Sequence, residues 1–363
     1  MWNLRLPDIS SAFRDLKIRK VLGRYLNVLE GKSAPKFLVS KKIPADYEQS
    51  DDSVKLWLIH DRTTEQYYQL EKEVDSEKKD LDTLSSPEKS YLDLKLKLAN
   101  QILQSCSFCV RNCCVNRTVG ELGWCRVGRD FKVSTIFAHM GEEPELIPSG
   151  TVFTVGCNLK CLHCQNWSIS QQYEAGESYT VKTLADIVRR LKSIGCRNLN
   201  MVGGEPTPYL HKWVETLNEA ETSIATVWNS NSYYSEVTAK ILAGVVDVYL
   251  LDFKYGNNKC AERISNAQMY WETCTRNHLC AIKYGELIIR VLLLPSHNEC
   301  CTKPILEWIA KNLGTDIRLN LMEQYRPEWR AFEIPELSRH LTRREVEEAV
   351  KMARNAGLTN LTI

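Results

Sequence analysis

Six short apolar segments, each followed by an amphipathic stretch, set the strongest limit on how this chain can fold. They span residues 151–155, 198–202, 224–228, 246–253, 287–294 and 317–321. Two of them, within VDVYLLDFK and LIIRVLLLP, are apolar almost throughout, as expected of parallel strands covered on both faces. Six strand–helix units between residues 149 and 363 predict an α/β fold with an open or partial barrel, and a doubly wound sheet is the alternative. In both folds the active site lies at the carboxyl ends of the strands.

Helix signals fall between these strands. One helical face is shared by Val181, Leu184, Ile187, Val188 and Leu191. Thr302 is expected to cap a helix that ends at Gly314. Thr342 and Glu345 form a capping box for a last helix, which Gly357 closes. The region from 149 to 363 therefore reads as one barrel domain.

Residues 1–104 are expected to form a helical N-terminal extension without cysteine. Ser86-Pro87 marks the expected start of an amphipathic helix whose apolar positions run from Tyr91 to Ile102. The region is either a packing collar for the barrel or a docking module for a partner. Its first residues, MWNLRLPDISSAFRDLK, carry charge throughout and lack the apolar core of a secretory signal.

Charge and cysteine content narrow the classes of partner. The net charge of +2 gives no electrostatic reason to expect nucleic acid, and no run of eighteen apolar residues predicts a membrane span. Fourteen cysteines are many for 363 residues, and eight of them lie between residues 106 and 164. Without a secretory signal, this clustering indicates metal or cluster binding by reduced thiols in the cytoplasm.

The stretch GCNLKCLHCQNWSIS brings three cysteines together directly after the first strand. Cys157, Cys161 and Cys164 have the spacing C-x3-C-x2-C. Three thiolates at this spacing can bind three corners of one cubane iron–sulfur cluster and leave the fourth iron open to a small molecule. The alternative is a zinc knuckle that uses His163 as its fourth ligand.

In this motif the sequence resembles the radical S-adenosylmethionine (SAM) superfamily, whose hallmark is C-x3-C-x2-C after the first strand of a partial (β/α)6 barrel. The resemblance implies a [4Fe–4S] cluster on Cys157, Cys161 and Cys164, with SAM as the ligand of the open iron. It also implies reductive cleavage of SAM to a 5′-deoxyadenosyl radical that takes a hydrogen atom from a substrate.

Two further polar segments end the second and third strands. The first comprises Gly203, Gly204, Glu205 and Pro206. Glycines let a backbone approach a ligand closely, and in the superfamily the matching motif meets the SAM amino group. Asn229 and Asn231 follow the third strand, where they either contact the ribose or carboxylate of SAM or serve as turn residues.

Charged residues end the fourth strand and interrupt the fifth. Asp252 and Lys254 resemble the Asp-x-Lys strand end of glycyl-radical activating enzymes, in which the lysine approaches the SAM carboxylate; the alternative is a solvated strand end. Arg290 needs an anionic partner within its apolar strand. That partner is either the SAM carboxylate, as the resemblance implies, or a structural ion pair with Asp252 or Asp247.

A closer resemblance covers residues 105–363, to the branch called pyruvate formate-lyase activating enzyme-like. Segments VNR, HMGEEPEL, CQNWSIS, LLDFKYGN and QYRPEW carry it, together with a second cysteine set in residues 105–148. That set, here called the quartet, comprises Cys106, Cys109, Cys113 and Cys125. It is expected to hold an auxiliary iron–sulfur cluster or zinc. Cys114 is an extra thiol beside Cys113 and leaves open which of the two binds.

The remaining cysteines are interpreted as ordinary thiols. They are Cys196, Cys260, Cys274, Cys280, Cys300 and Cys301. Free cysteine is often a small buried apolar residue. A substrate or redox role for the adjacent Cys300-Cys301, or for Cys274 with Cys280, is the alternative.

The sequence thus predicts a radical SAM enzyme, related to activating enzymes, that abstracts hydrogen from a protein or peptide residue. Such an enzyme needs an electron donor of the ferredoxin or flavodoxin kind, and neither nucleic acid nor a membrane is expected as a partner. One alternative is a non-catalytic, zinc-stabilised scaffold. Another is a radical SAM enzyme that modifies peptides by thioether formation or methylation. Fold and cofactor motifs do not identify the substrate.

Overall fold

The structure is a computed structural model that describes residues 15–363. The segment on which the expected absence of a secretory signal rests lies almost entirely outside these residues. Within residues 15–363, no helix combines the length and the apolar character needed to cross a membrane.

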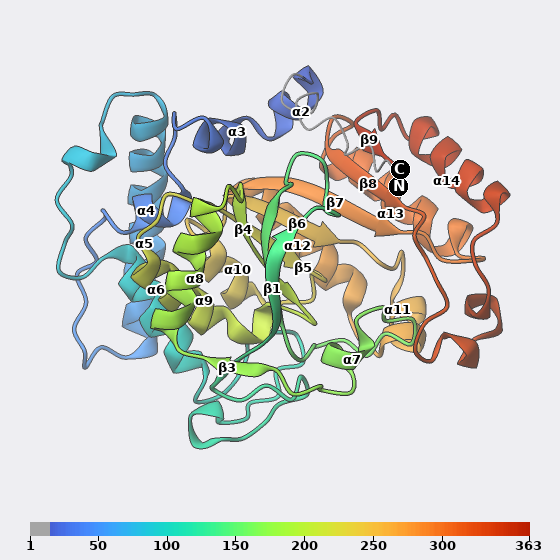
Figure 1. The fold of residues 1–363 in the computed structure, drawn as a ribbon, viewed down its shortest axis with the longest axis horizontal. Helices are drawn as coiled ribbons and strands as arrows, with labels where there is room; N and C mark the ends of the chain where they lie inside the picture. The colour runs from blue at the N-terminus through green and yellow to red at the C-terminus, as the bar shows by residue number, and fades with distance from the viewer. Residues whose placement is uncertain (1–14) are drawn as a thin grey trace.

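A single sheet organises the molecule (Figure 1). Its strands are β1 (Phe131–His139), β2 (Ser149–Thr154), β3 (Glu177–Tyr179), β4 (Asn198–Gly203), β5 (Ala225–Ser230), β6 (Val248–Asp252), β7 (Glu286–Leu292), β8 (Arg318–Met322) and β9 (Leu361–Thr362). Among residues 15–363 they form a nine-stranded sheet in the order β3-β1-β2-β4-β5-β6-β7-β8-β9. Neighbours from β2 to β9 pair in parallel, whereas β1 pairs antiparallel with both β2 and β3. The predicted α/β fold with a parallel sheet is confirmed, and a partial barrel describes it.

All six predicted strands are present, as β2 and β4 to β8. The sequence prediction did not include β1, β3 or β9. β1 lies toward the edge of the sheet, and half of its length alternates between buried and more exposed residues. Such a strand lacks the continuous apolar run of a strand covered on both faces. Strands β3 and β9 are short, with three and two residues.

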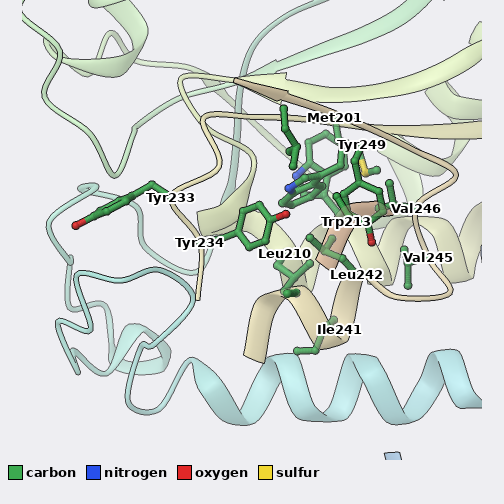
Figure 2. Packing of buried hydrophobic residues seen from close by; sticks show 14 of the residues in the cluster. Met201, Leu210, Trp213, Tyr233, Tyr234, Ile241, Leu242, Val245, Val246 and Tyr249 are labelled. Carbon is green, nitrogen blue, oxygen red and sulfur yellow. The ribbon is translucent and has the colours of Figure 1, made fainter. Parts of the chain in front are cut away.

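Helices occupy each crossover between parallel strands. They are α7 (Trp167–Ser170), α8 (Val181–Ser193), α9 (Leu210–Ala220), α10 (Glu236–Leu242), α11 (Asn258–Ser265), α12 (Tyr270–Tyr284), α13 (Lys303–Asn312) and α14 (Arg343–Asn355). Figure 2 shows the core that they make with the sheet: Met201 of β4 and Tyr249 of β6 lie beside Trp213 of α9 and Leu242 of α10. These four side chains are almost fully buried. Burial of such side chains is the main stabilising contribution to the crossover geometry.

The N-terminal extension packs onto the barrel. Its helices are α2 (Leu16–Val21), α3 (Gly23–Leu29), α4 (Lys36–Ser40), α5 (Ser53–Asp75) and α6 (Tyr91–Ile102). Leu26 of α3 belongs to a buried cluster with Val227, Leu250 and Ile288, which come from three neighbouring parallel strands. The backbone N–H of Tyr25 donates to Glu286, at the amino end of β7. Helix α3 therefore closes the barrel at the amino ends of its strands, as a packing collar does.

The loop between β1 and β2, near one end of the sheet, forms ion pairs with β7 and β8, near the other end. Glu143 in this loop forms an ion pair of 2.7 Å with Arg290 of β7, and Glu145 forms one of 2.7 Å with Arg318 of β8. Both carboxylates are buried. Buried charges are stable only when paired in this way, so the loop holds the partial barrel in shape.

One predicted helix start is wrong, and one predicted capping bond is not made. Helix α6 begins at Tyr91 rather than after Ser86-Pro87, because Ser90 and Asp93 form a capping box there. Helix α13 does begin directly after Thr302 as predicted, but Thr302 has a helical backbone and makes no side-chain capping bond, because a five-residue π-helix, η4 (Asn298–Thr302), runs directly into α13. The capping box of Thr342 in α14 is confirmed.

Candidate active site

A cavity of about 500 Å³ opens at the carboxyl ends of the parallel strands. Its wall includes Cys157, Cys161, Cys164, Gly203, Gly204, Glu205, Asn229, Asn231, Asp252, Lys254 and Arg290. These are the predicted cluster-binding and SAM-binding residues with the exception of Pro206, which lies next to Glu205 at the start of the 3-10 turn η3 (Thr207–Tyr209). A volume of this size falls within the range of small-molecule sites. The fold therefore gathers the predicted residues from the ends of five parallel strands at one surface.

The loop that carries the three cysteines, here called the cluster loop (157–164), follows β2 directly. The Sγ of Cys157 accepts from the backbone N–H of Leu159 at 3.4 Å and from Nδ2 of Asn231 at 3.5 Å. Hydrogen-bond donors that point at a sulfur favour its thiolate form. Burial, Glu205 and the two other thiols nevertheless raise the pKa of Cys157 well above its usual value, so the thiolate needs a bound metal to stabilise it.

The other two thiols of the cluster loop also contact hydroxyl groups. Ser265 at the end of α11 donates from Oγ to the Sγ of Cys161 at 2.9 Å. The Sγ of Cys164 lies 3.1 Å from the Oγ of Ser170 in α7. Burial raises the pKa of Cys161 to about 11, against the lowering effect of the Lys254 charge. Metal binding would compensate this cost, because a bound metal stabilises the thiolate.

The spacing of the three thiols argues against the zinc knuckle. Cys161 and Cys164 raise the pKa of Cys157, and Cys164 raises that of Cys161, so the three thiols are neighbours. In the part of the chain that the structure describes, however, their sulfur atoms do not all lie within 4.8 Å of one another. His163 is not added to them: its Nε2 lies 3.1 Å from the hydroxyl of Tyr255. One zinc ion needs its ligands packed around a single centre, whereas a cubane takes each thiolate on a different iron. The residues present fit a cubane.

Glu205 contacts the protein's own donors. Its carboxylate accepts from the Thr207 hydroxyl at 2.5 Å, from the Ser230 hydroxyl at 2.7 Å and from the backbone N–H of Asn231 at 2.9 Å. Burial raises its pKa, and these donors oppose the rise. The carboxylate therefore ties the end of β4 to the end of β5 and fixes the cavity wall.

The two asparagines after β5 have different neighbours. Nδ2 of Asn231 donates to Oδ1 of Asn158 at 2.8 Å, and its Oδ1 accepts from the backbone N–H of Tyr233. Asn158 in turn donates to the carbonyl of Tyr233. Asn229 accepts from Arg290 at 3.3 Å. Asn231 thus supports the cluster loop, and Asn229 supports the far wall of the cavity.

Asp252 and Lys254 form an ion pair of 2.6 Å at the end of β6. Their side chains are 22% and 17% exposed, so this strand end is not solvated as the alternative interpretation required. Burial opposes the charge of Lys254, but Asp252 and the nearby Cys161 and Cys164 raise its pKa. Lys254 therefore stays protonated and carries a fixed positive charge beside the cluster loop.

Arg290 is bound to partners that sequence reasoning missed. Its guanidinium donates to both oxygens of Glu143 at 2.7 Å and also to Glu142. The expected structural pair with Asp252 or Asp247 is wrong, since Asp247 accepts from Arg24 at 3.0 Å instead. The two adjacent glutamates in HMGEEPEL were the available signal, because a buried arginine requires an anion.

The quartet lies outside the cavity, in the segment between α6 and β1. Burial raises the pKa of Cys109, and the thiols of Cys125, Cys106 and Cys113 raise it further. The four thiols therefore lie near one another, but within residues 15–363 no three of them fall mutually within 4.8 Å. Cys114 is exposed, and its Sγ lies 3.4 Å from the carbonyl of Asn112. Of Cys113 and Cys114, therefore, Cys113 is the one whose thiol lies near the other thiols of the quartet.

The quartet segment touches the cluster loop directly. Nε of Arg111 donates to the carbonyl of Asn158 at 3.0 Å. Gly156, just before the cluster loop, has a φ of +88°, and a Cβ there would lie 2.7 Å from the carbonyl oxygen of Cys125. Only glycine fits this left-handed, closely packed position. The two cysteine sets are therefore built side by side.

Comparison with known proteins agrees with this geometry. The sequence matches the radical SAM superfamily over residues 151–309. It is 41% identical over 343 residues to the uncharacterized protein MJ0674 of Methanocaldococcus jannaschii, covering 93% of this chain and 98% of that protein. The uncharacterized protein MJ0808 of the same organism is 26% identical over 275 residues, covering 68% of this chain and 79% of that protein.

The comparison with solved structures found SuiB of Streptococcus suis. SuiB bound to the precursor peptide SuiA has a TM-score of 0.42 and 17% identity, over 56% of this chain and 46% of SuiB. SuiB bound to S-adenosylmethionine has a TM-score of 0.41 and 18% identity, over 57% of this chain and 47% of SuiB. The similarity spans less than half of the SuiB chain.

Proposed function

This chain belongs to the radical SAM superfamily, and from that premise we propose that its cavity binds SAM and carries out hydrogen abstraction from a peptide or protein residue. The observation that supports this most is the meeting of eleven predicted site residues, from the ends of five parallel strands, at one cavity. A family motif in the sequence alone does not require such convergence. A non-catalytic scaffold would have no need of it.

The superfamily's cofactors are a [4Fe–4S] cluster and SAM. Cys157, Cys161 and Cys164 would hold the cluster, since their thiols face the cavity and contact donors suited to thiolates. Together the two cofactors supply one-electron cleavage of SAM to methionine and a 5′-deoxyadenosyl radical, which abstracts hydrogen. The protein contributes binding, orientation and electrostatics.

The charged residues of the cavity have different roles in binding SAM. Lys254 holds a positive charge beside the cluster loop and is the best-placed cation for a ligand carboxylate. Arg290 is already neutralised by Glu142 and Glu143, so we assign it to the cavity wall, with Glu143 also accepting from Asn320 at 2.9 Å. Glu205 positions the backbone of the Gly-Gly-Glu-Pro segment by its three donors.

For the quartet, we propose an auxiliary iron–sulfur cluster in preference to zinc. Its thiols influence one another without packing around one point, as a cubane requires. Arg117 is fully buried beside it, and its Nη1 lies 3.9 Å from the Sγ of Cys106. A fixed positive charge there favours the thiolate form. Its contact with the cluster loop suits a relay of electrons from a ferredoxin or flavodoxin-like donor.

The test is metal analysis joined to an activity assay on one anaerobically reconstituted sample. Two cubanes predict about eight irons and eight sulfides per chain. Dithionite with SAM is expected to give 5′-deoxyadenosine. About four irons with zinc would exclude the auxiliary cluster and keep the enzyme. Iron without 5′-deoxyadenosine would overturn the catalytic proposal.

The second candidate is modification of a peptide by thioether formation or methylation. It shares the cavity and the auxiliary cluster with the first, and the two differ in product. Mass spectrometry of proteins incubated with enzyme, SAM and reductant separates them. Thioether formation removes two hydrogens from the substrate, methylation adds a methyl group, and glycyl-radical formation leaves an oxygen-sensitive cleavage site.

A further inference from the structure

A third group of metal-ligand side chains lies outside the cavity and outside the quartet. Cys260 in α11, His297 before η4 and Cys300 within η4 each offer one ligand atom, and these three atoms lie within 4.8 Å of one another. In the part of the chain that the structure describes, no other set of three meets this limit. Their sequence separation explains why the cysteines were interpreted as ordinary thiols. We call Cys260, His297 and Cys300 the compact group.

We propose that the compact group binds one Zn²⁺ ion through two thiolates and one imidazole, with its fourth position open to solvent. The Sγ atoms of Cys260 and Cys300 lie 3.9 Å apart. Two thiolates on one tetrahedral zinc ion lie about 3.8 Å apart, because each Zn–S bond is about 2.3 Å long. The observed separation therefore matches shared coordination of a single ion.

The histidine of the compact group is oriented as metal-binding histidines are. Nδ1 of His297 donates to the carbonyl of Pro295 at 2.7 Å. That bond places the ring proton on Nδ1 and leaves the lone pair on Nε2, the arrangement by which a backbone carbonyl fixes the tautomer of a ligand. His297 is 3% exposed. A buried ring held in this way does not rotate away from its neighbours.

The backbone around the compact group is shaped to bring two distant loops together. Asn257 accepts from the backbone N–H of Cys260 at 2.8 Å, and its Nδ2 donates to the carbonyl of Cys300 at 2.7 Å. Gly256 permits the approach, since a Cβ there would lie 2.5 Å from the carbonyl oxygen of Cys301. The π-helical turn of η4 is itself a rare form that occurs frequently at functional sites.

The fourth coordination position is left to solvent. Cys301 lies nearby, with its Sγ 4.0 Å from the Sγ of Cys300, but its sulfur is not within 4.8 Å of all three ligand atoms. Cys300 is exposed, so water reaches the site. Three protein ligands with one open position distinguish reactive zinc sites from closed structural ones.

Zinc at this point would join the loop after β6 to the loop after β7. The first of these loops also carries Lys254, which lines the cavity. The proposal does not depend on SAM chemistry, because none of its three ligands lines the cavity. Loss of zinc and loss of SAM cleavage can therefore be scored separately.

The experiment measures zinc per chain by mass spectrometry of metals in the full-length protein, purified anaerobically without added zinc. Cys260→Ser, Cys300→Ser and His297→Gln are each expected to lose about one zinc per chain relative to the unmutated protein. Cys280→Ser is the matched control, because Cys280 is half-buried like Cys260 and belongs to no ligand set. Iron content reports whether each variant folds.

X-ray absorption at the zinc edge completes the test. The expected first shell has two sulfurs and two lighter atoms, whereas zinc held by the quartet would show four sulfurs. Equal zinc in Cys300→Ser and Cys280→Ser would overturn the proposal, and Cys300→Ser should fold because this side chain is exposed. A disulfide between Cys260 and Cys300 in the anaerobic protein would overturn it as well.

Discussion

The cluster loop and the compact group both sit after barrel strands, yet their thiols are spaced differently. In the cluster loop the three thiols influence one another but do not lie mutually within 4.8 Å, while in the compact group all three ligand atoms do. A cubane spreads its thiolates over separate irons, and one zinc ion draws its ligands around one point. Thiol spacing therefore distinguishes the two kinds of site before any metal is measured.

The two sites also differ in how the chain assembles them. The cluster loop carries its three cysteines within eight residues, 157–164. The compact group needs Cys260 from one crossover and His297 with Cys300 from the next. Short-range spacing is readable in a sequence, whereas contact between two crossovers appears only in the fold. This explains why one site was predicted and the other was not.

The largest effect is expected from Cys161→Ser. Removing one of three thiolates leaves the cluster without a complete set of protein ligands, so formation of 5′-deoxyadenosine should fall to the background rate. The measurement is product formation with dithionite and SAM. Cys196→Ser is the control, because Cys196 is also buried but lies outside the cavity. Zinc in the compact group should stay unchanged in both variants, and its loss in Cys161→Ser would remove the claimed independence of the two sites.

A smaller effect, on iron content, is expected from a substitution in the quartet. The adjacent residues Cys113 and Cys114 provide the comparison. Cys113→Ala should lower the iron content from about eight to about four per chain, because Cys113 lies among the quartet thiols. Cys114→Ala should leave the iron content unchanged, since its side chain is exposed. Iron loss in Cys114→Ala but not in Cys113→Ala would reverse the assignment of the quartet.

Much of the fold could be predicted from the sequence, because strands and helices leave local patterns in it. All six apolar runs became parallel strands, and their polar ends met at one cavity. It missed the partners of Arg290, since Glu142 and Glu143 are separated from it by more than 140 residues. It also expected a capping bond from Thr302, which is not made because the chain continues from a π-helix into α13. Long-range ion pairs and irregular helical turns depend on packing, which the pattern of one segment does not contain.

The next effect concerns SAM affinity rather than metal content. Glu205→Ala would leave three donors from two strand ends without their acceptor, so SAM binding should weaken about tenfold, which is about 1.4 kcal/mol. Iron content and cluster absorbance should be retained, because the substitution leaves Cys157, Cys161 and Cys164 in place. Isothermal titration with SAM measures the change, and Glu219→Ala on the exposed face of α9 is the control. Equal affinity in the two variants would place Glu205 outside the binding surface.

The smallest expected effect tests the contact between the quartet and the cluster loop, with two glycines that share a backbone conformation. Gly156 has a φ of +88° and Gly195 a φ of +91°. A Cβ on Gly195 meets nothing within 4 Å, whereas one on Gly156 meets the side chain of Val127 at 2.6 Å and the carbonyl of Cys125 at 2.7 Å. Gly195→Ala therefore measures the backbone cost alone, about 1 kcal/mol.

Gly156→Ala should cost more than Gly195→Ala by about 1–3 kcal/mol, because the added methyl group must also push the quartet segment away from the cluster loop. Thermal unfolding of the two reconstituted variants measures the difference. If the quartet relays electrons, Gly156→Ala should also slow 5′-deoxyadenosine formation with a protein reductant more than with dithionite, since only the first uses the relay. Equal slowing with both reductants would mean that the contact between the two cysteine sets is structural and that electrons enter the cluster loop by another route.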